Sequence, residues 1–226
     1  FVDGVSVGSL DAGPGLLAGP TALFIGSARS TLGFWTGDLL EIVAYDRELR
    51  GIERNMIQAY FSARYGTPSP RALFAFGATH SGDVAGIGQE TTAERTPEAE
   101  GAGILRVSAP SALSDGDYLL WGTDKPADFS LSPDVPLPFP QRLTRTWAYT
   151  LTDGGRGDGV GRVNLRFRVG GLFVSTSPDD FALLFDEDGT FADAEVRTGP
   201  SSYDPTLDTI EFTSVSLPAA RFLALA

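Results

Sequence analysis

The chain has 226 residues, no cysteine and a formal net charge of −12. This length suffices for one large or two small domains, and a hydrophobic fraction of 42% is typical of a globular protein. The absence of cysteine excludes disulfides and thiolate metal sites. The acidic charge argues against nucleic acid as a partner, and no apolar run approaches the roughly eighteen residues needed for membrane insertion.

Residues 51–64 carry the clearest helical pattern. Apolar side chains recur there at helical spacing, at Ile52, Met56, Ala59, Tyr60 and Ala63. Gly66 suits the left-handed position after a helix, and Pro68 blocks continuation. Ser or Thr is absent from the start, where Arg50 and Gly51 stand, so we expect this end to be frayed or capped from elsewhere.

Residues 37–49, Gly-Asp-Leu-Leu-Glu-Ile-Val-Ala-Tyr-Asp-Arg-Glu-Leu, precede this helix, which ends at Tyr65-Gly66. Together they resemble the closing strand and C-terminal helix of bacterial LamG-like, concanavalin A-type jelly rolls, with their "E-x-x-x-Y-D-R-x-L" pattern. Residues 1–7 resemble the hairpin of that family and residues 22–26 its "L-x-I-G" strand. The resemblance covers residues 1–66 and implies a partial jelly roll, so we expect further strands in the native polypeptide upstream of Phe1. It also implies a secreted or cell-surface protein.

Residues 67–72 predict a Pro-rich linker, because paired prolines favour an extended connector. Residues 73–226 predict an antiparallel β-sandwich of short apolar runs separated by Gly, Pro and Asp. Residues 162–169 alternate, so Val163, Leu165, Phe167 and Val169 should face the core. The expected strands are residues 73–76, 104–107, 118–121, 146–151, 161–169, 181–185, 209–212 and 221–225.

Four elements of this second region resemble an uncharacterised β-sandwich that follows LamG-like domains in large bacterial surface proteins. They are residues 83–88, 117–122, 142–147 and 184–191. The fold class expected for the whole chain is therefore all-β: a partial jelly roll with one C-terminal helix, then an antiparallel β-sandwich.

An acidic turn at residues 186–193 is the candidate metal site. Calcium takes six to eight oxygen ligands, which Asp186, Asp188, Asp193 and the Thr190 carbonyl could help to supply. The spacing is not that of an EF-hand. The alternative is an acidic hairpin turn with Gly189 at positive φ.

The Gly-rich loop at residues 152–161 contains Arg156-Gly157-Asp158, which resembles the integrin-binding tripeptide. Calcium ligation by Asp153 and Asp158 is a second hypothesis for this loop. The alternative to both is a long hairpin connection, for which glycines are well suited.

Arginines and tryptophans offer further candidates. Arg162, Arg166 and Arg168 form one face of a predicted strand and could bind acidic polysaccharide, or could pair with acidic residues on neighbouring strands. Trp121 and Trp147 lie in apolar strands and should be core residues, whereas Trp35 is the tryptophan to test for sugar contact.

Enzymatic patterns are missing. Glu41 is not followed two residues later by a second acid, so residues 37–49 do not carry the paired carboxylates of jelly-roll glucanases. His80 is the only histidine and lies in a polar stretch, so we expect a solvated loop residue. The sequence favours a non-catalytic structural or adhesive module that contacts glycans or other surface proteins. The alternatives are a carbohydrate-binding module of a secreted hydrolase, and a filament subunit completed by a strand from another chain.

Overall fold

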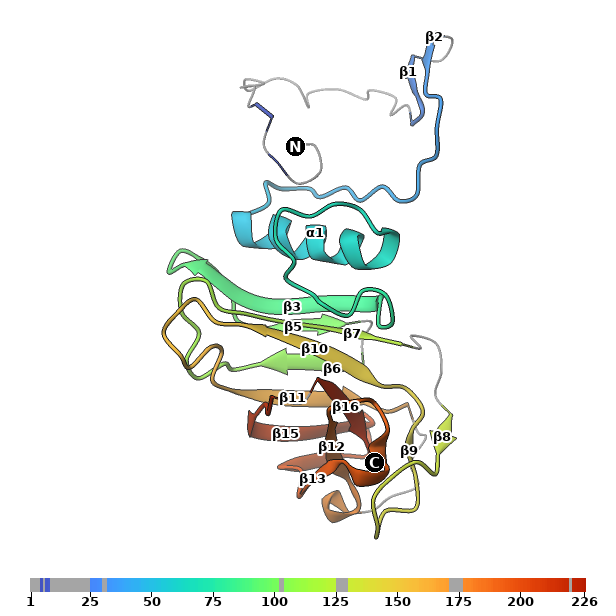
Figure 1. Cartoon of the computed structure of the whole chain (residues 1–226), viewed down its shortest axis with the longest axis vertical. Helices are drawn as coiled ribbons and strands as arrows, with labels where there is room; N and C mark the ends of the chain where they lie inside the picture. Colours follow the sequence, from blue (N-terminus) through green and yellow to red (C-terminus); the bar gives the residue numbers. More distant parts are fainter. Residues whose placement is uncertain are drawn as a thin grey trace.

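The computed structural model describes residues 5, 7–8, 25–29, 32–101, 104–124, 130–170, 177–219 and 221–226. Within these ranges the chain forms one α-helix, two short 3₁₀ turns and sixteen strands (Figure 1). The elements are β1 (Ser27–Arg29), β2 (Leu32–Phe34), α1 (Gly51–Tyr65), β3 (Gly82–Thr91), β4 (Glu94–Thr96), β5 (Ala99–Gly101), β6 (Leu105–Ser108), β7 (Tyr118–Thr123), β8 (Leu131–Ser132), β9 (Arg142–Leu143), β10 (Trp147–Thr152), β11 (Arg162–Arg168), η1 (Pro178–Asp180), β12 (Ala182–Asp186), η2 (Phe191–Asp193), β13 (Glu195–Thr198), β14 (Ser202–Asp204), β15 (Thr209–Ser216) and β16 (Phe222–Leu225).

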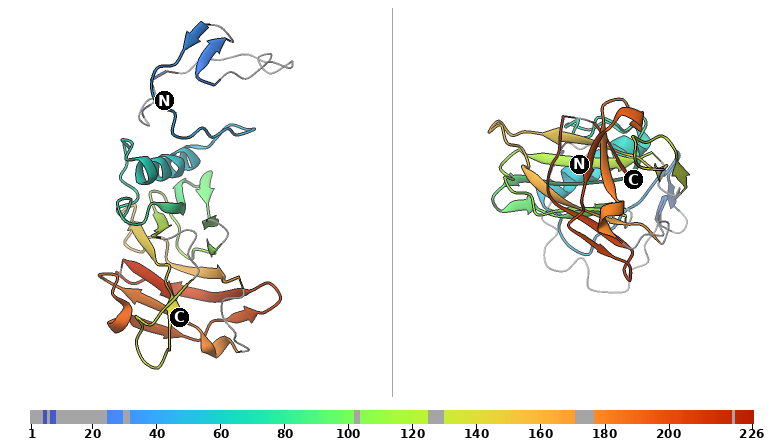
Figure 2. Two further views of the ribbon diagram at one scale, coloured as in Figure 1. Left: turned by 90° about the vertical axis from the view of Figure 1, so that its right-hand side faces the viewer. Right: turned by 90° about the horizontal axis from the view of Figure 1, so that it is seen from below.

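Two antiparallel sheets form a sandwich. One has seven strands in the order β13-β12-β16-β10-β7-β3-β4, and the other has five in the order β14-β15-β11-β6-β5. The largest apolar cluster fills the space between them and includes Trp121 and Trp147, both almost fully buried as predicted. In both side views α1 lies between this sandwich and the β1–β2 hairpin (Figures 1 and 2). The expected all-β class with one helix is therefore confirmed.

Strand β7 is buried along its whole length because both of its faces are covered. Leu119 and Trp121 point into the core between the sheets, whereas Tyr118 and Leu120 belong to a second cluster with Ile52 of α1. A continuous apolar run is what a strand covered on both faces requires. Helix α1 thus forms a third layer over one end of the seven-stranded sheet.

The other end of this sheet is covered by a different element. Leu183 and Phe185 of β12 face the central core, and Leu184 packs outward against Phe191 of η2 in a third cluster. All five residues of β12 are consequently buried. The same strand therefore carries apolar side chains toward both layers.

Strand β11 shows the opposite pattern, since one face of the five-stranded sheet is solvated. Val163, Leu165, Phe167 and Val169 are buried as predicted, and the intervening residues are partly or fully exposed. On the outer face, Arg166 lies opposite Glu211 of β15 and Arg106 of β6, which in turn faces Glu100 of β5. Acidic residues on neighbouring strands thus lie beside the arginines, as expected if the arginines pair within the sheet. Polysaccharide binding by this face remains a prediction.

Helix α1 confirms the prediction for residues 51–64 and extends it by one residue. Ile52 and Ala59 are buried on its apolar stripe, and Gly66 adopts the left-handed conformation with φ of 67°. At the other end, the Glu53 carboxylate accepts a hydrogen bond of 2.9 Å from the backbone N–H of Arg50. This reciprocal half of a capping box replaces the missing Ser or Thr.

Polar contacts also fix α1 to the sandwich. Asn55 donates hydrogen bonds to Glu90 at 2.9 Å and to the Tyr118 hydroxyl at 3.2 Å, and Arg71 forms an ion pair with Glu90. Burial raises the pKa of Tyr118 well above its usual value, so its hydroxyl stays protonated and donates to Glu90. The domain boundary at residues 67–72 stays a prediction; the helix that precedes it packs on the β-sandwich that follows it.

Two predicted strands are wrong. Residues 73–76 lead into a turn, in which Phe76 accepts hydrogen bonds from the backbone N–H groups of Thr79 and His80, while Leu73 packs under α1. Residues 37–49 form no strand, because no described strand lies beside them to complete a ladder. Most of residues 1–7 and 22–24, which were expected to form a hairpin and a strand, lie outside the described residues.

Candidate functional site

A groove of about 370 Å³ lies between residues 38–41 and the C-terminal half of α1. We call it the α1 groove. Leu39, Leu40 and Phe61 make its surface mainly apolar, while Asp38 and Glu41 contribute carboxylates. This volume and mixture lie within the range of protein ligand sites. The complete lining is Asp38, Leu39, Leu40, Glu41, Gln58, Phe61, Tyr65, Thr67 and Pro68.

Glu41 anchors the outer wall of the α1 groove to the helix. Its carboxylate accepts hydrogen bonds from the Tyr65 hydroxyl at 2.6 Å and the Tyr60 hydroxyl at 2.9 Å, and the Arg64 Nε lies 3.9 Å away. The Tyr65 hydrogen bond, opposed by desolvation and supported by Tyr60 and Arg64, holds the pKa of Glu41 below its usual value. Glu41 is therefore ionised, and its hydrogen bonds hold residues 38–41 in place beside α1.

Residues 32–45 form an exposed apolar strip, which we call the apolar segment. Half or more of the surface of most of its large side chains is accessible, and Trp35 is 62% exposed. These side chains are Leu32, Phe34, Trp35, Leu39, Leu40, Ile42, Val43 and Tyr45. Soluble monomers rarely expose apolar residues in such a continuous series.

Trp35, the predicted sugar-contact residue, lies at the start of this segment and outside the lining of the α1 groove. Its backbone N–H donates to the carbonyl of Gly26 at 2.8 Å, beside the β1–β2 hairpin. Its indole faces Gly37, where an added Cβ would come within 3.0 Å of Trp35 Nε1. The ring is thus positioned by the local backbone and open to solvent, and sugar contact stays a prediction.

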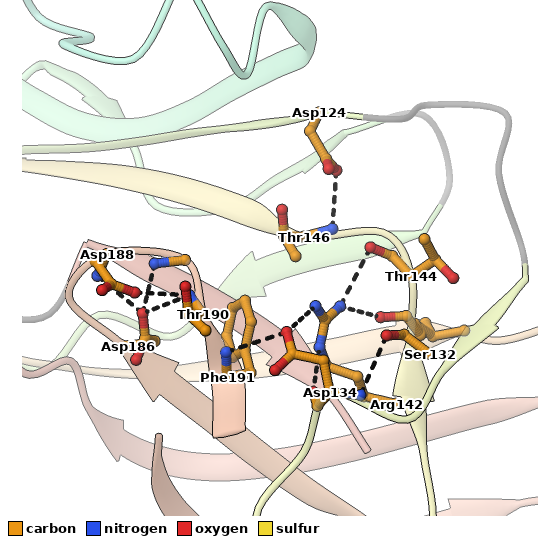
Figure 3. A network of polar contacts seen from close by, with 12 residues as sticks. Asp124, Ser132, Asp134, Arg142, Thr144, Thr146, Asp186, Asp188, Thr190 and Phe191 are labelled. Carbon is orange, nitrogen blue, oxygen red and sulfur yellow. Dashed lines mark hydrogen bonds and ion pairs between the residues drawn. The ribbon is translucent and has the colours of Figure 1, made fainter. Parts of the chain in front are cut away.

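The predicted calcium loop holds its carboxylates against its own backbone (Figure 3). Asp186 Oδ1 accepts hydrogen bonds from the N–H groups of Asp188 at 2.8 Å and Thr190 at 3.1 Å. Asp188 Oδ1 accepts from the Thr190 N–H at 2.8 Å, which lowers the pKa of Asp188. Asp193 lies exposed in η2. Gly189 adopts a positive φ of 90°, as the hairpin-turn alternative expects. Within the described residues no group of three or more acidic or histidine side chains is arranged to hold a metal, and calcium ligation by this loop stays a prediction.

The Arg156-Gly157-Asp158 tripeptide lies on an exposed turn between β10 and β11. Asp153 Oδ1 accepts hydrogen bonds from the N–H groups of Gly155 at 2.8 Å and Arg156 at 3.0 Å. These bonds shape the turn and lower the pKa of Asp153. The loop presents the tripeptide to solvent, and adhesion through it stays a prediction, as does calcium ligation by Asp153 and Asp158.

Arg142 is a buried arginine that sequence reasoning did not single out (Figure 3). It connects the segment of residues 130–144 to the third core cluster. The Arg142 guanidinium pairs with Asp134 Oδ2 at 2.9 Å and lies 4.5 Å from the centre of the Phe191 ring. It also donates to the Leu143 carbonyl at 2.7 Å. The sequence offered no clear signal, because Arg142 stands between Gln141 and Leu143 and its carboxylate partner is eight residues away.

His80 corrects a second expectation: it is buried and not solvated. Only 7% of its surface is exposed, and its ring nitrogens lie 3.0 Å from the hydroxyls of Thr79 and Thr146. Burial lowers the pKa of His80, so the ring is neutral at pH 7. These hydroxyls satisfy the buried ring, and the contact with Thr146 ties the turn to the residue that precedes β10.

Comparison with known proteins finds no matching family model, no similar curated protein and no similar solved structure. Within the described residues, no helix has the length and apolarity to cross a bilayer.

Proposed function

We propose that this chain is a non-catalytic adhesive and spacing module of a secreted bacterial cell-surface protein. The observation that carries the proposal is the apolar segment, which presents a row of exposed aromatic and aliphatic side chains beside α1. Helix α1 is fixed to the sandwich through a buried interface, so the segment is displayed from a rigid body. The hydrophobic effect favours burial of such a surface against a partner.

Two further features support an exterior location. The resemblance of residues 1–66 to part of a LamG-like module points to surface proteins, and the net charge of −12 suits a protein that must stay soluble outside the cell. Both features concern the class of protein, and neither selects a ligand.

A binding panel tests this proposal. Labelled full chain is applied to immobilised glycans and extracellular proteins, and each bound panel member is then analysed by mass spectrometry for chemical change. We expect binding without chemical change, lost in the double variant Leu40→Ser/Ile42→Ser. The matched control is Leu137→Ser/Leu207→Ser, which removes exposed leucines of the sandwich, 92% and 64% accessible. Product release, no binding to any member, or equal loss in both variants contradicts the proposal.

Carbohydrate binding is the second candidate, and the exposure of Trp35 favours it. An accessible indole provides an apolar face on which a sugar ring stacks, and the carboxylates of the nearby segment accept sugar hydroxyls. Glycan-array signal that disappears in Trp35→Ala and persists in Phe34→Ala would assign the surface to carbohydrate. Equal signal in the two variants would leave no role for Trp35.

A further inference from the structure

Residues 36–46 have a backbone that is open toward the rest of the described chain. Within the described residues, none of its N–H or C=O groups is hydrogen-bonded to another backbone group, and the last such bond before it is from Trp35 to Gly26. Backbone polar groups in this state are bonded to water and are available to a neighbouring strand. The segment contains Leu, Ile, Val and Tyr with neither Gly nor Pro between residues 38 and 49, a composition that favours an extended strand.

Large apolar side chains of this segment are exposed at both odd and even positions. Leu39, Val43 and Tyr45 are 50%, 44% and 48% exposed, whereas Leu40 and Ile42 are 64% and 56% exposed. Leu39 and Leu40 both line the α1 groove, and Glu41 reaches Tyr60 and Tyr65 of α1. A strand that is apolar on both faces belongs in a sheet covered on both sides.

Charge distinguishes between the possible partners. Asp38, Glu41 and Asp46 lie in or beside the segment, and the chain as a whole carries a net charge of −12. Arg47 is engaged by Glu53 through contacts of 2.8 Å, and Arg64 lies 3.9 Å from Glu41. Asp38 and Asp46 therefore carry the negative charge of this segment that has no basic partner in an ion pair within the described residues. Pairing with a second copy would bring like charges together, whereas a basic strand would be attracted.

We propose that residues 38–45 are a strand-addition site, whose open backbone pairs with an extended segment of another protein. That segment has alternating apolar side chains and lysine or arginine at its ends. Main-chain hydrogen bonds supply the affinity, and the α1 groove receives side chains from the added strand. This inference rests on the proposed adhesive function and assigns the chemistry of its partner.

The test uses the full chain and synthetic peptides. The probe is a peptide of alternating Val and Thr with Lys at both ends; one control has Glu at both ends, and the other has Pro in place of the central Val and Thr. Fluorescence anisotropy measures affinity, and hydrogen exchange locates protected amides. We expect the Lys peptide to bind roughly tenfold more tightly than either control, and to protect residues 38–45 from exchange.

Two variants isolate the backbone contribution. Ile42→Pro/Val43→Pro removes one N–H group from each edge of the segment, and Ile42→Thr/Val43→Thr keeps both N–H groups and the branched side chains. We expect the proline variant to lose binding by roughly tenfold or more, and the threonine variant to retain most of it. Circular dichroism checks that the sandwich is unchanged in both.

Three outcomes would overturn the inference: equal affinity for the Lys and Pro peptides, protection elsewhere in the chain, or equal binding by the proline and threonine variants. Concentration-dependent dimerisation that is lost in the proline variant would instead assign a second copy as occupant. If panel binding is lost in Leu40→Ser/Ile42→Ser but survives in the proline variant, the adhesive function stands and strand addition fails.

Discussion

Ile52→Ala tests whether α1 is part of the sandwich or of a separate unit before residues 67–72. Ile52 is fully buried at the first turn of the helix, in the cluster formed with Leu73, Tyr118 and Leu120. If the helix and sheet unfold together, truncation at this interface lowers the free energy of unfolding of the whole described body. If the helix belongs to a separate unit, the sandwich unfolds as before.

The magnitude follows from the methyl and methylene groups removed. Ile→Ala deletes three carbon groups, each worth about 0.8 kcal/mol of transfer free energy when buried. The cavity left beside Tyr118 and Leu120 adds to this, since β3 and β7 are held by their ladder and cannot close the space. The expected loss is about 2–4 kcal/mol. Ile42→Ala, the same change at a position 56% exposed, should alter stability by less than about 0.5 kcal/mol.

Urea unfolding followed by tryptophan fluorescence is the appropriate assay, because Trp121 and Trp147 report on the core between the sheets. Far-ultraviolet circular dichroism measured in parallel follows the helix. We expect one coincident transition in both signals, displaced to lower urea in Ile52→Ala and unchanged in Ile42→Ala. An unchanged fluorescence midpoint in Ile52→Ala would refute the reasoning and favour an independent N-terminal unit.

Three further changes address the sandwich itself. Burial lowers the pKa of His80, so the folded chain binds a proton at His80 less readily than the unfolded chain. The contribution of neutral His80 to the free energy of unfolding is therefore complete above about pH 6.5 and declines as the pH falls below that value. The decline should be shallower in His80→Gln, and parallel pH profiles of the two proteins would contradict this prediction. Gly122→Ala should destabilise by about 2–3 kcal/mol, since its Cβ would lie 2.2 Å from the backbone oxygen of His80. Thermal denaturation of this variant beside the unaltered chain measures the loss. Asp134→Ala leaves the guanidinium of Arg142 without its carboxylate partner and should lower the free energy of unfolding, measured in urea, by about 1–3 kcal/mol. The carbonyl partners that remain limit the loss. Asp179→Ala, which removes an exposed acid, is the control, and equal urea midpoints for the two variants would show that the ion pair contributes nothing.

Local pattern was sufficient for the elements whose surroundings are simple. The alternation of residues 162–169 identified the core face of β11 because the other face of that sheet meets water. The apolar stripe and Gly66 located α1, since helical periodicity and the left-handed C-terminus are properties of the local chain. The acidic turn and the Gly-rich loop were also located, although the sequence could not tell whether their carboxylates face a metal or their own backbone N–H groups.

Other features were decided by contacts between distant segments. Strand β3 was not predicted, because Gly86 and Gly88 weaken a strand pattern; in the structure they leave room for Leu120 and Tyr118, and a Cβ at Gly88 would lie 2.5 Å from the Tyr118 ring. The opposite error occurred at residues 37–49, where a strong strand composition finds no described partner. A strand needs a neighbour to satisfy its backbone, and composition cannot show whether one is present.

The sequence by itself therefore determined the all-β class, the one helix, its stripe and its ends, and which face of β11 is buried, because all of these depend on periodicity within a single segment. Only the tertiary structure decided that α1 covers the seven-stranded sheet, that His80 is buried between two hydroxyls, that Arg142 reaches Asp134 and Phe191, and that residues 38–45 lie exposed over Tyr60 and Tyr65. Each of these features depends on contacts between segments that are distant in sequence, and those contacts set the burial, pKa and accessibility of the residues involved.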